Sequence, residues 1–283
     1  MNYRHAFHAG GFADVVKHAV LALLIQRLEQ KEGAFRVIDT HAGIGLYDLT
    51  GNEASRSGEW RDGIGRLWHR DLEPELVSLL APLLGAVKAA NAPVDTLRFY
   101  PGSPWIARHL FRRQDRLTAV ELHPHDVRAL AAVFAGDIQV RTIALDGWLA
   151  LGAFVPPKER RGLVLVDPPY EEMDEFDRLL DGFVNAHRRW PTGVYALWYP
   201  VKDLLAIDRL RIGLEKSGIG RLLRAELTVR ERSAGGTFNG TGLIICNPPW
   251  QFDKTLAALP TGLLPVLAQD NGAEHIIDEI AGE

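Results

Sequence analysis

The chain has 283 residues, of which 47% are hydrophobic and 24% charged, a composition typical of a soluble globular protein with a large core. No apolar run approaches the about 20 residues that span a membrane, no secretory signal precedes the first helix, and a single cysteine, Cys246, excludes an internal disulfide or a cysteine-cluster metal site, so we expect a cytoplasmic protein. The net charge of −4 excludes nucleic-acid binding through bulk positive charge and leaves only local basic clusters for such contacts.

The first elements expected along the chain are a helix, a strand and an insertion. Residues 11–31 carry apolar side chains at helical spacing and predict an amphipathic helix, and residues 35–39 predict a short strand. A simple strand–helix–strand unit needs only about 30 residues, yet the next strand signal comes at 117–121. We therefore expect an inserted helical subdomain at 48–98, within one domain that spans residues 1–283.

Strand and helix signals then alternate along the chain. Further strands are predicted at 138–143, 162–167, 193–198, 222–229 and 242–247. Helices are predicted at 104–113, 124–135, 172–189 and 202–217. This alternation predicts an α/β fold with a doubly wound, mostly parallel sheet and helices on both of its faces.

The most informative motif is the tetrapeptide Asp167-Pro168-Pro169-Tyr170, which follows the apolar run 162–166. Asp167 therefore leaves the carboxyl end of a buried strand, where open α/β sheets bind their ligands. The prolines lack N–H donors and leave rigid carbonyl acceptors, and Tyr170 can stack on a base swung out of its helix. These groups suit a planar substrate that bears an exocyclic NH2. The alternative is a rigid Pro-Pro turn after a strand.

A glycine-rich loop follows the first predicted strand of the sheet. Gly43 and Gly45 come shortly after Asp39, where glycine lets the backbone turn sharply and approach a ligand. We therefore expect Gly43 to contact a cofactor. The loop lacks the third glycine of the dinucleotide fingerprint, which argues against NAD.

Acidic residues end the next strands in order. Glu121 can bind both ribose hydroxyls of a nucleoside, and Asp146, followed by Gly147, can accept a hydrogen bond from an adenine amine. Asp167 ends the strand after that. Each acid taken alone is a turn residue or a helix cap, but together they predict a site for S-adenosylmethionine beside an amine-bearing base.

A second motif, Asn247-Pro248-Pro249-Trp250, resembles the first one and follows the predicted strand 242–247. In a methyltransferase-type sheet the final strand is antiparallel, so its end points away from the ligand crevice. We therefore interpret Asn247 as structural and assign the chemistry to the first motif.

The N-terminal motif, residues 1–18, concentrates histidines, cations and aromatic rings. We interpret it as a flap over the cofactor, with Lys17 and His18 reaching inward and Tyr3 able to stack on a base. The alternative is a surface arm whose phenylalanines pack against the first helix. No carboxylate or cysteine completes a standard metal-ligand set around these histidines, so we expect no metal.

Over essentially its full length the sequence resembles the RlmJ family of 23S ribosomal RNA adenine-N6 methyltransferases. The resemblance rests on Tyr3-Arg4-His5, Phe7-His8-Ala9-Gly10, Asp14-Val15, Lys17-His18, Asp39-Thr40-His41-Ala42-Gly43, Tyr100-Pro101-Gly102-Ser103-Pro104, Glu121-Leu122-His123-Pro124, Asp146-Gly147, Asp167-Pro168-Pro169-Tyr170, Tyr195-Ala196-Leu197-Trp198-Tyr199-Pro200 and Asn247-Pro248-Pro249-Trp250. The N-terminal block and the Ala-Leu-Trp-Tyr-Pro strand are more specific than the Asp-Pro-Pro-Tyr motif.

The resemblance implies a class I methyltransferase fold, Rossmann-like, with a small helical insertion after the first strand. It implies that Asp167 is the catalytic acceptor at the target amine and that Tyr3 touches the RNA. For Ser103, the residue pattern alone favours a helix cap, whereas the resemblance assigns it to the cofactor. The implied contacts to S-adenosyl-L-methionine are His18, His41, Ser103, Glu121, Asp146, Gly147 and Asp167.

The sequence thus predicts methyl transfer from S-adenosylmethionine to N6 of an adenine in 23S ribosomal RNA, with the nitrogen held in line with the methyl group. Asp167 and the carbonyl of Pro168 would accept the amine hydrogens. The alternatives are guanine-N2 methylation of RNA, adenine methylation of DNA, and a non-catalytic nucleic-acid-binding protein on the same fold. We expect naked or partly assembled 23S ribosomal RNA as the partner of a monomer, with no membrane and no obligate protein partner.

Overall fold

An eight-stranded sheet forms the centre of the structure, a computed structural model that describes residues 4–232 and 237–282. Its strands are β1 (Arg36–Asp39), β4 (Arg116–Glu121), β5 (Val140–Ala144), β6 (Gly162–Val166), β7 (Val194–Val201), β8 (Leu222–Thr228), β9 (Gly240–Cys246) and β10 (Glu274–Ala281). The order is β10-β8-β9-β7-β6-β1-β4-β5, and the strands from β7 to β5 run parallel. The remaining pairs are antiparallel. The predicted α/β fold with a mostly parallel sheet is confirmed.

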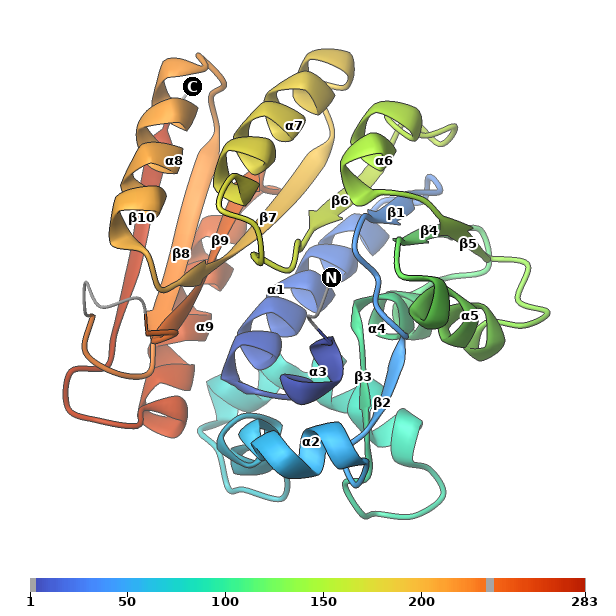
Figure 1. The fold of residues 1–283 in the computed structure, drawn as a ribbon, viewed down its shortest axis with the longest axis vertical. Helices are drawn as coiled ribbons and strands as arrows, with labels where there is room; N and C mark the ends of the chain where they lie inside the picture. Colours follow the sequence, from blue (N-terminus) through green and yellow to red (C-terminus); the bar gives the residue numbers. More distant parts are fainter. Residues whose placement is uncertain (1–3, 233–236, 283) are drawn as a thin grey trace.

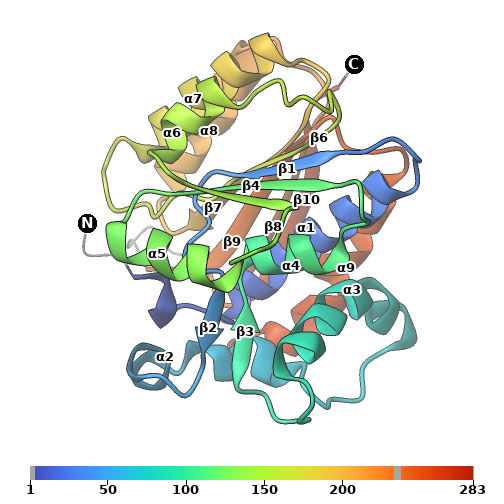
Figure 2. The ribbon, with the colours of Figure 1, turned by 90° about the vertical axis from the view of Figure 1, so that its right-hand side faces the viewer.

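Helices cover both faces of this sheet. They are α1 (Phe12–Glu29), α4 (Ser103–Leu110), α5 (Pro124–Val133), α6 (Gly147–Ala153), α7 (Glu175–Arg189), α8 (Leu204–Lys216) and α9 (Phe252–Leu267). Figure 2 shows α6, α7 and α8 on one face and α1, α4 and α9 on the other. Among the helices described, none is long and apolar enough to cross a membrane.

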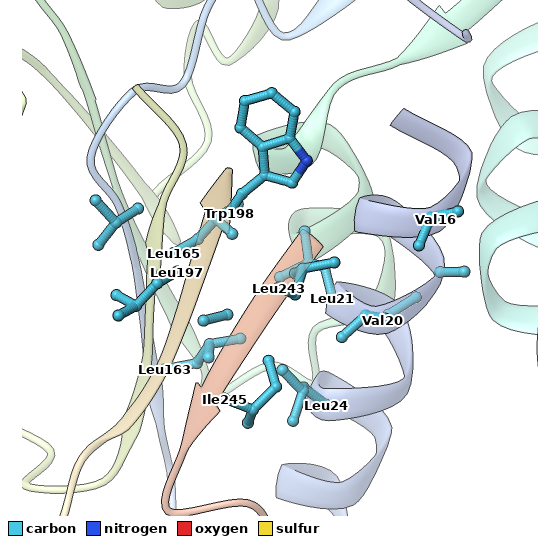
Figure 3. Close-up of a cluster of buried hydrophobic side chains, with 14 of the residues drawn as sticks. Val16, Val20, Leu21, Leu24, Leu163, Leu165, Leu197, Trp198, Leu243 and Ile245 are labelled. Carbon is cyan, nitrogen blue, oxygen red and sulfur yellow. The ribbon is translucent and has the colours of Figure 1, made fainter. Parts of the chain in front are cut away.

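Helix α1 lies at the centre of the hydrophobic core. Val16, Val20 and Leu24 face Leu243 and Ile245 of β9 across the cluster drawn in Figure 3, and all five side chains are buried. The other sides of α1 contact α3 (Pro74–Asn91), α4 and α9. The predicted helix is therefore present, but its predicted amphipathic character is wrong, because neighbours surround it and bury almost all of its residues.

The segment 48–98, predicted as an insertion, leaves and re-enters the body through a small antiparallel pair, β2 (Leu46–Asp48) and β3 (Phe99–Pro101). It contains α3, the short helix α2 (Asn52–Ser57) and the 3₁₀ turns η2 (Glu59–Asp62) and η3 (Ile64–Arg66). Figure 1 shows α2 and the β2–β3 pair at the lower end of the molecule. Since α3 packs on α1, α4 and α9, we propose a single domain with a helical insertion.

Several elements were not predicted from the sequence. Helix α6 is only seven residues long, and α9 contains Pro260 and Pro265, which ordinarily argue against a helix. Strand β10 lies at the edge of the sheet, where it pairs with β8, and its sequence mixes charged and apolar residues without strict alternation. The strand predicted at 242–247 was expected to be the last strand of the sheet. This expectation is wrong, because β10 follows β9 in the chain.

Asn247, at the end of β9, has the structural role that the sequence predicts. Its side-chain amide donates to the carbonyls of Pro191 and Gly193, each at 2.8 Å. Strand β9 is antiparallel to β7, so Asn247 lies at the edge opposite to the one that Asp167 reaches.

Candidate functional site

A cavity of about 260 Å³ opens at the carboxyl ends of the parallel strands. It brings together residues that the sequence predicts from strands and loops far apart in the chain. The predicted residues that line it are Lys17, His18, His41, Gly43, Ser103, Glu121, Asp146, Gly147, Asp167 and Pro168. Tyr170 lines a second cavity, and Tyr3 lies outside the described residues. One cleft therefore collects the acids, histidines and glycines of the predicted cofactor site.

The second cavity, of about 270 Å³, adjoins the first and has more aromatic walls. The two cavities share His5, Lys17, Asp167, Pro169 and Glu171. Tyr170 and Trp198 form part of the second wall, and the Tyr170 hydroxyl donates to the Trp198 carbonyl at 2.7 Å. Asp167 thus stands where a polar and a largely apolar cavity meet.

Lys17 holds the Asp167 carboxylate in place. Its ammonium lies 2.5 Å from Oδ2 of Asp167 and 2.9 Å from Oδ1 of Asp14. Burial opposes charge on Lys17, but Asp14 and Asp167 prevail and raise its pKa above the usual range. Burial likewise opposes charge on Asp14, but His5 and Lys17 hold its pKa well below the usual range. The result is a buried ion pair network that fixes the orientation of Asp167, so the Lys17 ammonium is already engaged by carboxylates.

The N-terminal motif is tied to this network by His5. Nε2 of His5 lies 2.9 Å from Oδ2 of Asp14, which also accepts the backbone N–H of Gly10 at 3.0 Å. His5 belongs to the 3₁₀ turn η1 (His5–Phe7) and lines both cavities. Phe12, at the start of α1, is buried and packs 5.1 Å from Phe238. The covering role of residues 1–18 stays a prediction.

Two histidines in the first cavity are neutral. Burial lowers the pKa of His18 to about 3 and that of His41 to about 4. Nδ1 of His18 is 2.9 Å from the Tyr100 hydroxyl, and Nδ1 of His41 is 2.8 Å from the Thr40 hydroxyl. Each ring can therefore offer its other nitrogen to a ligand without adding positive charge.

Glu121, at the end of β4, binds the glycine loop. Its Oε2 accepts the N–H of Gly43 at 2.9 Å and its Oε1 accepts the N–H of His123 at 2.8 Å. Burial raises the pKa of the Glu121 carboxyl despite these hydrogen bonds. Gly43 has φ +60°, and a Cβ there would lie 2.2 Å from the Tyr47 hydroxyl oxygen, so the loop requires glycine at this position.

Asp146 is both a helix cap and part of the cavity wall. Its Oδ1 accepts the N–H of Trp148 at 2.7 Å and caps α6. Its Oδ2 lies 3.6 Å from the guanidinium of Arg178, which stacks 5.1 Å from the Trp148 ring. Asp146 is therefore a helix cap, which was the alternative interpretation of this acid from the sequence. It also lines the cavity.

Ser103 does not cap α4, contrary to the expectation from the residue pattern alone. Gly102 is the N-cap residue, and the Ser103 hydroxyl donates to Oδ2 of Asp39 at 2.7 Å. Burial raises the pKa of Asp39 to about 7, although the Ser103 hydrogen bond opposes this shift. Asp39 thus fixes a wall residue of the cavity while its own carboxyl is poised to titrate near neutrality.

Replacing Asp39 with asparagine should remove a pH dependence of stability. A raised folded-state pKa means that the stabilisation is complete below the unfolded-state pKa and is lost as the pH rises to about 7. We expect Asp39→Asn to match the wild type near pH 4 and to gain on the order of 4 kcal/mol relative to it by pH 8, since the pKa of Asp39 is raised from 3.8 to about 7. Urea titrations across this range measure the difference, and a pH-independent difference would contradict the assignment.

Gly147, the first residue of α6, permits close packing against the glycine loop. A Cβ there would lie 2.3 Å from the Thr40 carbonyl oxygen and 2.6 Å from the His41 ring. We expect Gly147→Ala to destabilise the fold by about 1–3 kcal/mol and to weaken ligand binding in the cavity. Gly152, in the same helix, has no atom within 4 Å of its Cβ position, so Gly152→Ala is the matched control. Equal effects in thermal unfolding would contradict this account.

The cavity also contains residues that the sequence did not identify. Trp148 directly follows the predicted pair Asp146-Gly147, Glu171 and Glu172 directly follow the Asp-Pro-Pro-Tyr motif, and Glu175 comes shortly after them, so proximity in sequence was the available signal. Arg178 gave no such signal, because its position depends on the packing of α7 against α6. The unpredicted wall residues are His5, Ala42, Tyr47, Leu122, His123, Asp126, Trp148, Pro169, Glu171, Glu172, Glu175 and Arg178.

Sequence comparison relates the chain to ribosomal RNA methyltransferases. Residues 32–277 match a family model described as RsmJ: Ribosomal RNA large subunit methyltransferase D, RlmJ. The chain is 39% identical over 283 residues to a Haemophilus influenzae protein named Ribosomal RNA large subunit methyltransferase J, covering 100% of both chains. It is 42% identical over 256 residues to the Escherichia coli protein of the same name, covering 90% of each.

Comparison with solved structures identifies proteins of similar fold. A Legionella pneumophila protein of known crystal structure is similar with a TM-score of 0.86 and 31% identity, covering 96% of this chain and 98% of that one. A probable spermidine synthase from Corynebacterium glutamicum has a TM-score of 0.50 at 13% identity, covering 96% of this chain and 77% of that one, which is a likeness of fold alone.

Proposed function

We propose a function for this chain on one premise: it belongs to the RlmJ family of ribosomal RNA large subunit methyltransferases. The chain transfers a methyl group from S-adenosylmethionine to N6 of an adenine in 23S ribosomal RNA. The observation that carries this proposal is the position of Asp167, which stands between two cavities of similar size. A methyl donor in one cavity and a base in the other would meet at its carboxylate.

The first cavity suits the cofactor because its lining is strongly acidic. Among the described residues, Lys17 and Arg178 are the only lysine or arginine side chains in its wall. Its carboxyl residues are Glu121, Asp126, Asp146, Asp167, Glu171, Glu172 and Glu175. S-adenosylmethionine supplies an electrophilic methyl group on a positively charged sulfonium, which this lining favours over the product that has lost the charge.

The residues that would hold the cofactor are those that the sequence predicts. We assign Glu121 to the ribose hydroxyls and Asp146 to the adenine end, since ligands bind at the carboxyl ends of such strands. His18 and His41 can hydrogen-bond without charge, since their pKa values are low. Ser103 completes the wall, held by Asp39.

The second cavity suits a base turned out of the RNA. Lys17 binds Oδ2 of Asp167, and we assign Oδ1 and the carbonyl of Pro168 as acceptors for the two hydrogens of the target amine. These contacts direct the nitrogen lone pair toward the methyl group, so that catalysis is mainly positioning. Tyr170 and Trp198 provide the flat walls against which the base packs.

The remaining parts of the proposal concern the RNA contacts, the cellular location and the oligomeric state. Tyr3 and Lys17 are proposed to contact the RNA near the target base, with Tyr3 outside the described residues. The substrate is 23S ribosomal RNA, naked or partly assembled, and the protein acts in the cytoplasm as a monomer without an obligate protein partner. Of these assignments, only the large-subunit ribosomal RNA substrate extends the names of the relatives to this chain.

Nucleoside analysis tests the proposed reaction. Naked 23S ribosomal RNA that lacks the modification is incubated with the protein and isotope-labelled S-adenosylmethionine, then digested and analysed by mass spectrometry. We expect labelled N6-methyladenosine. Labelled N2-methylguanosine would instead support the guanine methyltransferase alternative. Absence of product together with absence of cofactor binding in calorimetry would support a non-catalytic nucleic-acid-binding protein.

A further inference from the structure

Two exposed arginines of the segment 48–98, Arg56 and Arg61, form what we call the arginine pair. Arg56 lies in the last turn of α2, and Arg61 lies in the 3₁₀ turn η2. The guanidinium carbon of Arg56 is 5.9 Å from the centre of the Phe7 ring, and that of Arg61 is 5.0 Å from the centre of the Trp60 ring. A ring can cover only one face of a guanidinium, so the N–H donors at its edge stay available to a ligand.

The acids around the arginine pair already have other basic partners. Residues 51–66 contain three acids, and each of them contacts a basic side chain outside the pair. These contacts are Glu53 with Arg4 at 2.9 Å, Glu59 with His8 at 3.0 Å, and Asp62 with Arg66 at 2.6 Å. Within the part of the chain that the structure describes, Arg56 and Arg61 therefore have no carboxylate partner, and uncompensated surface cations favour an anionic partner.

The arginine pair stands beside the second cavity. Glu59, which lies between the two arginines in sequence, lines that cavity together with His5 and His8. Helix α2 contacts the N-terminal turn η1, and the N–H of Ile64 donates to the Gly10 carbonyl at 2.8 Å. Figure 1 shows α2 below the start of α1, at the lower end of the molecule. A strand whose base enters the second cavity would therefore pass close to the pair.

We propose that the arginine pair binds phosphate groups of the RNA next to the target nucleotide, so that the insertion orients the strand while the second cavity holds the base. This inference rests on the proposed function, since it takes the second cavity to be the base site. A guanidinium binds phosphate through two parallel N–H donors, and phosphate contacts fix orientation without reading sequence. The pair thus supplies local positive charge in a protein whose net charge is −4.

Filter binding of the intact protein to naked, unmodified 23S ribosomal RNA tests the proposal. The double variant Arg56→Gln/Arg61→Gln removes both charges, and Arg188→Gln is the matched control. Arg188 is exposed, lies near the end of α7 and lines neither cavity. Helix α7 connects the parallel strands β6 and β7, so it ends at the edge of the sheet opposite to the one at which the cavities open.

The quantity to measure is the slope of the logarithm of the association constant against the logarithm of the salt concentration, between about 50 and 200 mM. Each phosphate contact contributes about 0.7–0.9 to this slope. We expect the double variant to lose about 1.5 of the slope and to bind on the order of twentyfold more weakly near 0.1 M salt. We expect Arg188→Gln to bind within about twofold of the wild type, because a distant exposed charge is screened.

Two further measurements separate charge from packing. Arg56→Lys keeps the charge that Arg56→Gln removes, so we expect it to keep most of the wild-type slope. All variants should bind S-adenosyl-L-homocysteine as the wild type does in calorimetry, because neither arginine lines the first cavity. If the double variant does not fold, Arg56→Gln and Arg56→Lys decide the question alone, and equal slopes for these two would contradict the proposal.

Three results would overturn the proposal. The first is a double variant with the wild-type slope and affinity, and the second is weaker binding with an unchanged slope. The third is an equal loss in Arg188→Gln, which bulk charge alone explains. A wild type that binds no RNA would overturn both the proposal and the proposed function. Binding that depends on the arginine pair, together with methylation of guanine, would support the proposal and refute the adenine reaction.

Discussion

We expect that substituting Asp167 with alanine will lower the rate constant of methyl transfer by at least about a hundredfold, the scale for losing a group aimed at the reacting atom. Without the carboxylate, one of the two acceptors proposed to position the target amine would be lost. The fold should persist, because Lys17 keeps its ion pair with Asp14 at 2.9 Å. Single-turnover methylation of ribosomal RNA measures the rate, and circular dichroism verifies the fold.

Asp174→Ala is the control for this substitution. Asp174 is an exposed acid on the loop that follows the motif, it lines neither cavity, and its side chain makes no capping hydrogen bond. We expect it to retain full activity. An active, folded Asp167→Ala enzyme would refute the assignment of Asp167.

Replacing Lys17 with methionine should destabilise the fold by about 3–5 kcal/mol, the cost of removing one partner from a buried ion pair. The side chains of Lys17 and Asp14 are each 3% exposed, and that of Asp167 is 11% exposed. Two carboxylates would then lie close together in a buried site without their shared cation. Urea denaturation near pH 8 measures the loss in the free energy of unfolding.

The loss caused by Lys17→Met should shrink as the pH falls. In the wild type, the depressed pKa of Asp14 contributes stability that is present above the ordinary carboxyl pKa and is lost as the pH falls through its lowered value. In the variant, protonation of the unpaired carboxyls relieves their burial. Lys88, exposed near the end of α3, supplies the control Lys88→Met. A loss below about 1 kcal/mol, as for a surface ion pair, would show that the network is not a buried one.

The sequence predicted the sheet well because its parallel strands are buried on both faces. The run 162–166 is apolar throughout, and β6 is buried at every position, so its identity as a central strand needs no knowledge of its partners. Edge strand β10 and helix α9 lack such local signals, since their pairing and packing partners come from distant parts of the chain. Helix α1 has a clear local signal, and its location was predicted correctly. Its burial on nearly all sides was not predicted, because it depends on the packing of α3, α4 and α9.

The site could be predicted in part for the same reason. Acids at strand ends gather at one edge of any such sheet, so the convergence of Glu121, Asp146 and Asp167 follows from topology. The partners of these acids do not follow from it. Lys17 and Asp167 are 150 positions apart in sequence, and only the packing of α1 under β6 brings them together. The hydrogen bond from Ser103 to a buried carboxyl, in place of a helix cap, is likewise a long-range contact.

We propose that a methyl group held in one cavity is transferred, beside Asp167, to one adenine amine of the large-subunit RNA held in the other. The most direct measurement is position-resolved mapping of labelled methyl groups on unmodified 23S ribosomal RNA after incubation with the wild type and with Asp167→Ala. The account predicts N6-methyladenosine at a single position with the wild type and none with the variant. Label on guanine, label spread over many adenines, or equal labelling by both proteins would contradict it.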